Sequence, residues 1–123
     1  MAEASVDFAS SAIKELFPPS GPVRTDFVGE LDRAVIERGE RKCEFMNWQL
    51  THQMAGYYDE MEQLLSQLPL GGSQYMKVRY DSTLRRPVAE FVPIDEILVP
   101  YAATNFYTAP RVTHRQLVTR QQY

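Results

Sequence analysis

Apolar side chains recur at intervals of three and four positions in three parts of the chain, a spacing that places them on one face of a helix. We therefore predict helices over residues 2–17, 30–50 and 53–68, the first of which is ended by Pro18. The second and third are expected to pack antiparallel or to form one bent helix around Thr51. The predicted apolar face of the second helix comprises Leu31, Ala34, Val35, Met46 and Leu50, and that of the third comprises Met54, Tyr57, Tyr58, Met61, Leu64, Leu65 and Leu68.

The spacing changes to two after the third helix, where apolar and polar side chains alternate as in a strand with one buried face. A hairpin is predicted from residues 74–81 and 87–92, which flank a polar turn. Short strands are predicted over residues 97–99 and 111–118. The expected fold class is α+β, with about three helices packed on a small, mainly antiparallel sheet of about four strands in a single domain, residues 1–123.

Two irregular segments carry apolar and aromatic side chains. Residues 18–29 are rich in proline and glycine, so regular structure is not expected there. The segment is too apolar for a free linker, and we expect an ordered arm that lies on another surface; a loop packed on the core of its own chain is the alternative. The connection over residues 101–110 is aromatic in the same way, and its side chains are either exposed or docked. Candidate contacts with a neighbouring subunit are Val23, Phe27, Tyr101, Phe106 and Tyr107.

Composition narrows the classes of function. A chain of 123 residues suffices for one domain with a buried core. Its 13 basic and 16 acidic side chains give a net charge of -3, so nucleic acid or an anionic membrane is not attracted overall. Cys43 is the single cysteine, which excludes an internal disulfide and fits a reducing compartment. No apolar run approaches the roughly 20 residues of a membrane span, so we expect no membrane partner.

Residues that commonly carry catalysis or bind metals are few and scattered. His52 and His114 are the two histidines, and neither belongs to a motif with metal-ligand spacing. Cys43 lies in a predicted helix, where its basic sequence neighbours point away from it. We therefore predict no metal site, no cofactor and no enzymatic activity. A different hypothesis, an enzyme, would use His114 and Asp95 as acid and base.

Basic side chains cluster around the predicted hairpin. Lys77, Arg79, Arg85 and Arg86 alternate there with tyrosines, a combination that suits contact with single-stranded nucleic acid. A small nucleic-acid-binding domain is therefore an alternative function. The same four residues are also typical of a solvated hairpin, or of a contact with a protein partner.

Several segments resemble the portal proteins of tailed double-stranded-DNA bacteriophages, of the type found in short-tailed phages. The specific part is the run RRPVAEFVPIDEILVPY at 85–101 followed by APRVTH at 109–114, and it is accompanied by ELFPP at 15–19, FMNWQLT at 45–51 and KVRYD at 77–81. These segments keep the family's order over nearly the whole chain. Gly56 and the pair Asn105–Phe106 depart from the residues usual in the family, which affects local packing.

The resemblance implies a structural function. Portal subunits form a dodecameric ring at one vertex of the capsid, where the ring supports head assembly and lets double-stranded DNA pass during packaging and ejection. The implied partners are further copies of the subunit, the terminase, which hydrolyses ATP, and the capsid, scaffold and tail proteins; the implied location is the virion, after assembly in the host cytoplasm. This chain resembles the N-terminal, outward-projecting wing region of a larger subunit. Thr119 and Gln122 fit a capping box at the start of a further helix, which also suggests a fragment.

Overall fold

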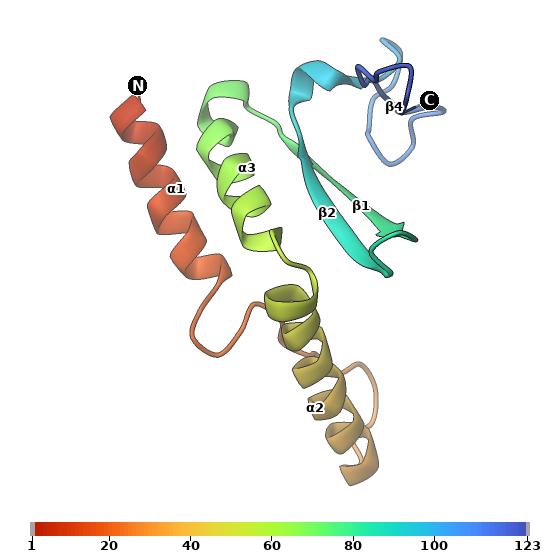
Figure 1. The fold of residues 1–123 in the computed structure, drawn as a ribbon. Coiled ribbons are helices and arrows are strands. Elements are labelled where there is room, and N and C mark those ends of the chain that lie inside the picture. The colour runs from red at the N-terminus through yellow and green to blue at the C-terminus, as the bar shows by residue number, and fades with distance from the viewer. Residues whose placement is uncertain (1, 123) are drawn as a thin grey trace.

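The computed structural model describes residues 2–122 and combines α-helices with two small antiparallel sheets (Figure 1). This confirms the predicted α+β class. The helices are α1 (Ala2–Leu16), α2 (Arg33–Trp48), the π-helix η1 (Gln49–Gln53), α3 (Tyr57–Gly71) and the 3₁₀-helix η2 (Ile94–Glu96). The strands are β1 (Tyr75–Asp81), β2 (Arg86–Val92), β3 (Ile97–Leu98) and β4 (Thr113–His114).

Helix α1 lies antiparallel beside α3 (Figure 1). Its buried residues, Ser5 and Ala9, are small, so the two helices can approach closely. Just beyond α1, the ring of Phe17 packs against Tyr57 and Tyr58 of α3, with ring centroids 5.7 and 5.1 Å apart. These contacts give α1 the partner that a short amphipathic helix needs.

The other side of α3 faces β2, the inner strand of the hairpin (Figure 1). Strands β1 and β2 pair antiparallel, with Val78 opposite Ala89. The buried hydrophobic residues of the described chain are Ala9, Met54, Leu65, Ala89 and Val92. The core is therefore small, and α1, η1–α3 and β2 supply it.

Helices α2 and α3 are joined end to end through η1, with a change of direction, and do not pack side by side (Figure 1). The antiparallel alternative is therefore wrong, and the bent-helix alternative is the closer one. The Thr51 hydroxyl donates a hydrogen bond to the carbonyl oxygen of Asn47, one turn earlier, where it competes with the backbone bond of a regular α-helix. Gly56, with φ of 91°, then separates the two helices.

Helix α2 differs from its prediction at both its start and its face. It begins at Arg33 rather than residue 30, because the Asp32 side chain caps it by accepting a hydrogen bond from Ala34 N at 2.8 Å. The apolar face predicted for it is not a core face: Leu31, Val35 and Met46 are exposed. The one buried residue of α2 is Gly39. The predicted face found no partner because α2 extends away from α1, α3 and the hairpin (Figure 1).

Helix α3 runs past its predicted end at residue 68. Pro69 lies in its last turn. The proline ring removes one backbone N–H donor, and the helix tolerates this loss because it ends only two residues later, at Gly71. The helix ends where Gly72 takes a φ of 81° and its N–H donates to Leu68 O at 2.9 Å. The prediction that this helix carries the central apolar stripe is confirmed at Leu65, whereas Tyr58 is exposed. Met54 is buried too, but α3 begins at Tyr57 rather than residue 53, so Met54 lies in the junction before the helix.

The four strands form two separate two-stranded sheets rather than one sheet of four strands. The last strand is two residues long, not the eight predicted over 111–118, because its only strand partner is the equally short β3. Pairing continues for one more bond, from Arg115 N to Glu96 O at 2.8 Å. The predicted helical turn before β3 is present as η2.

Candidate interaction surface

The Pro/Gly-rich arm, residues 18–29, is ordered on α2 of its own chain. The side chain of Asn47 holds the arm at Val23: Val23 N donates to Asn47 Oδ1 at 2.8 Å, and Asn47 Nδ2 donates to Val23 O at 3.2 Å. Cys43 adds a third bond, from Sγ to Val23 O, at 3.2 Å. The arm thereby satisfies backbone groups that no strand or helix would pair.

Phe27 fixes the far end of the arm by lying directly over Gly39 of α2. A Cβ added at Gly39 would come 2.5 Å from Phe27 Cε1 and closer still to Cζ, so only glycine leaves room for this ring. Gly39, Cys43 and Asn47 are spaced four residues apart and share one face of the helix. Both arm candidates, Val23 and Phe27, are therefore half-buried against this face in cis.

The three aromatic candidates of the 101–110 connection differ in their surroundings. Tyr101 and Tyr107 are almost completely exposed. Phe106 stacks on Tyr75 of β1, with centroids 5.2 Å apart and planes inclined by 26°, and its edge meets Tyr107 at 6.1 Å. Phe106 thus borders a small apolar cavity of about 290 Å³ beside the hairpin.

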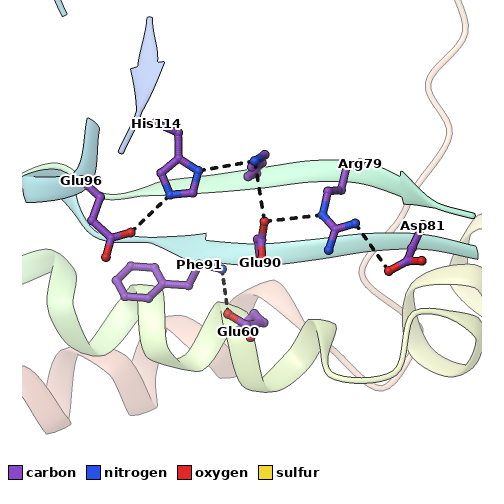
Figure 2. A network of polar contacts seen from close by, with 8 residues as sticks. Glu60, Arg79, Asp81, Glu90, Phe91, Glu96 and His114 are labelled. Carbon is purple, nitrogen blue, oxygen red and sulfur yellow. Dashed lines mark hydrogen bonds and ion pairs between the residues drawn. The ribbon is translucent and has the colours of Figure 1, made fainter. Parts of the chain in front are cut away.

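Two basic residues of the hairpin, Lys77 and Arg79, belong to a line of alternating charges on one face of the sheet. Figure 2 shows this line from Glu96 and His114 to Glu90, Arg79 and Asp81. Lys77 lies between the two halves, with Nζ 3.4 Å from His114 Nδ1 and 4.0 Å from Glu90 Oε1. Arg79 contacts Glu90 at 3.6 Å and Asp81 at 3.5 Å.

Geometry assigns the proton of the neutral His114 imidazole. Nδ1 faces the Lys77 ammonium, which has no acceptor, so Nδ1 accepts. Nε2 then carries the proton and donates to Glu96 Oε2 at 3.3 Å. The carboxylate beside His114 is therefore Glu96 and not the Asp95 of the enzyme hypothesis. This pair joins β4 to η2, and the Lys77 contact joins His114 to the hairpin.

The other two basic residues of the hairpin, Arg85 and Arg86, differ in their contacts. Arg86 donates from Nη1 to the carbonyl oxygens of Gln53 and Ala55, at 3.1 and 3.4 Å, and so ties the hairpin to the junction before α3. Arg85 is exposed in the turn with φ of 54°, and within residues 2–122 its side chain makes no hydrogen bond or ion pair. Three of the four cations are thus engaged within the chain, and Arg85 is the one that is not.

Asp81 shapes the hairpin turn. Its carboxylate accepts hydrogen bonds from Leu84 N and Thr83 N, at 3.1 and 2.9 Å, and these bonds, with that of Leu84 foremost, hold its pKa below the ordinary value of 3.8. In the helical layer, burial raises the pKa of the Tyr57 hydroxyl above 10.0. Both shifts have structural causes and neither group lies in a converging acid–base pair.

The residues considered for chemistry have local structural roles. Cys43 donates to the arm, as described above, and His52 is exposed with Nδ1 2.8 Å from its neighbour Thr51 Oγ1. Among residues 2–122, no group of three or more His, Cys, Asp or Glu side chains is placed to hold a metal ion.

Sequence reasoning missed two surface features. The first is Glu60, whose Oε2 accepts from Phe91 N at 2.7 Å and so caps the open edge of β2 (Figure 2). The second is an acidic groove between α3 and the end of β2, a cavity of about 630 Å³. Its residues include Asp59, Glu62, Ser66, Phe91 and Pro93. The sequence spacing places Asp59, Glu62 and Ser66 on one face of a helix, but it does not predict that β2 packs beside that face.

The chain matches no protein-family model and no curated protein. None of the helices in residues 2–122 is long and apolar enough to cross a membrane. The resemblance to portal proteins therefore depends on the sequence segments themselves.

Proposed function

We propose that this chain is a structural assembly module that completes its packing against other protein surfaces, as a wing segment of a phage portal ring does. The supporting observation is its accessible surface of 10018 Å². A compact monomer of 14.2 kDa exposes roughly 6,800 Å² by the scaling of surface with mass. The excess of roughly 3,200 Å² is the kind of surface that association removes from water.

The excess surface is rich in apolar side chains. Large hydrophobic residues are exposed on α2, at the hairpin tip and along residues 98–118, whereas the described chain buries only five hydrophobic residues. Scattered exposed apolar residues are normal, but a long helix covered only by an irregular arm is not typical of a self-sufficient monomer. The pattern favours a partner that is present whenever the protein functions.

A portal ring supplies such partners for a wing segment. In that setting the chain contacts neighbouring copies and the scaffold and shell proteins around the ring, while the terminase docks elsewhere and hydrolyses ATP. The net charge of -3 suits a part that does not grip DNA. The paired cations of the hairpin are consistent with the same role, because their charge is used within the chain.

Electron microscopy of the complete gene product tests this function. We expect closed rings of a fixed number of subunits, with this segment projecting outward. A complete product that remains monomeric at every concentration in analytical ultracentrifugation contradicts the proposal. Binding of single-stranded nucleic acid at low salt that is lost in the Arg85→Ala, Arg86→Ala double variant would instead support the alternative function.

A further inference from the structure

One face of α2 is exposed and carries two arginines followed by two aromatic residues. We call Arg38, Arg41, Phe45 and Trp48 the Arg–aromatic stripe. At 100° per residue these positions lie within about 80° of one another around the helix axis, on the side opposite Gly39, Cys43 and Asn47, which the arm covers. Phe45 and Trp48 are 56% and 48% exposed and their rings are 5.9 Å apart.

The two arginines of the stripe have no ionic partner among residues 2–122. The ion pair that α2 makes within residues 2–122 joins Arg33 and Glu37, so Glu37, one turn before Arg41, is already paired with another arginine. Arginine beside exposed aromatic rings is the composition typical of residues that dominate binding at protein interfaces. The stripe therefore has the chemistry of an interface, with positive charge at one end and apolar surface at the other.

The acidic groove has the complementary chemistry. Asp59 and Glu62 form its acidic end and are exposed without an ion pair in residues 2–122. Ser66 follows on the same face of α3, and Pro93 with Phe91 provides the apolar wall opposite. The rest of the lining is formed by Gln63, Gln67 and Gln74, so the groove is acidic at one end, apolar along one wall and polar elsewhere.

We propose that the Arg–aromatic stripe of one copy of this chain docks into the acidic groove of a second copy. The stripe has residues at 38, 41 and 45 and the groove has residues at 59, 62 and 66, so both follow the same i, i+3, i+7 spacing. Laid parallel, Arg38 meets Asp59, Arg41 meets Glu62, and Phe45 lies beside Ser66 near the apolar wall. This inference deepens the proposed function and rests on it.

The geometry of this contact also suits a ring. Stripe and groove are different surfaces of one chain, so the contact is head-to-tail and repeats from copy to copy until it closes or extends. A standard interface removes about 800 Å² from each partner, and a subunit in a ring has two such contacts. The resulting demand of about 1,600 Å² per subunit is within the excess surface given above.

Charge reversal tests the contact in a way that is specific to a head-to-tail arrangement. Arg38→Glu with Arg41→Glu, and separately Asp59→Lys with Glu62→Lys, place like charges opposite each other. We expect each variant to raise the dissociation constant of self-association at least about tenfold in analytical ultracentrifugation. An equimolar mixture of the two variants restores opposite charges at every contact, so association should return.

The matched control reverses two exposed arginines outside both surfaces, Arg111→Glu with Arg120→Glu, and changes the net charge equally. Equal weakening by this control, or no recovery in the mixture, overturns the inference. A second readout is disulfide crosslinking in a Cys43→Ser background: Arg41→Cys and Glu62→Cys chains should crosslink only when mixed. A wild-type chain that does not self-associate overturns the inference, and ring imaging of the complete gene product then decides the proposed function separately.

Discussion

Substituting Gly39 by alanine tests whether the arm is held on α2 by close packing. The new methyl group would stand 2.5 Å from Phe27 Cε1, about 1 Å inside ordinary van der Waals contact, and the ring must lift to make room. Phe27 cannot move freely, because Val23, four residues earlier, is bonded to Asn47 and Cys43. The substitution therefore acts on the whole arm.

Two opposing effects set the magnitude. Overpacking of this kind costs about 1–3 kcal/mol, whereas replacing glycine by alanine inside a helix gains about 0.8–1.0 kcal/mol. We expect Gly39→Ala to lower the free energy of unfolding by up to about 2 kcal/mol. In a Phe27→Ala background the obstruction is absent, so the same substitution should raise it by up to about 1 kcal/mol.

Urea unfolding of the four members of this double-mutant cycle, followed by circular dichroism at equal protein concentration, measures the coupling. A coupling energy of about 1–3 kcal/mol between the two positions is the expected result. Equal stabilisation by Gly39→Ala in both backgrounds would refute the close contact. It would mean that the arm does not rest on Gly39 in solution.

Three further predictions follow from the packing and the polar contacts. Leu65→Ala should lower the free energy of unfolding by about 2–5 kcal/mol because Leu65 is buried, whereas Val112→Ala, at a side chain 41% exposed, should cost less than about 1 kcal/mol; equal losses in denaturant titrations would contradict this core. Glu60→Ala should cost about 1–3 kcal/mol and speed hydrogen exchange at Phe91 N–H, which loses its acceptor, whereas Glu60→Gln should keep that amide protected. Because the folded-state pKa of Asp81 lies below its unfolded value, its stabilising contribution is complete above the ordinary aspartate pKa and is lost as pH falls through the lowered value; an NMR titration midpoint of the carboxyl group at or above 3.8 would contradict this.

The helices and the hairpin could be predicted from the sequence because their signals are local. The α3 stripe has helical spacing over several turns, and the alternation in β1 has strand spacing over a full strand. The predicted helix ends were wrong where a single side chain sets the boundary, as Asp32 does at the start of α2. They were also wrong where a helix tolerates a proline in its last turn, as α3 does at Pro69. Such boundaries depend on one contact, which spacing does not encode.

The separation of the strands into two sheets could not be predicted. The length of β4 depends on its partner β3, which is ended by a proline two residues later, and not on the apolar content of residues 111–118. A strand pattern identifies residues that can pair but not the number of bonds that a partner offers. The sequence therefore predicted four strands, the last of them too long, and the single sheet expected from them is two separate sheets.

The charged surface of the hairpin was predicted only in part: the sequence identified its cations but not the carboxylates that pair with them. The sequence identified Lys77 and Arg79 as exposed cations, but Glu90, which neutralises both, comes from the opposite strand. Only the register of the hairpin, in which Lys77 stands opposite Glu90, brings these groups together. Composition gives the number of charges, whereas function depends on how many remain unpaired after folding.

Helix α2 carries the arm on one side and the Arg–aromatic stripe on the opposite side. An isolated helix of 16 residues is only marginally stable in water, and α2 lacks the tertiary packing that stabilises α1 and α3. The arm supplies that packing through Asn47, Cys43 and Gly39, and so fixes the helix before any partner arrives. A surface that is already ordered costs less conformational entropy on binding. The arm therefore contributes to assembly from the side that does not touch the neighbour, by holding the Arg–aromatic stripe in one helical geometry.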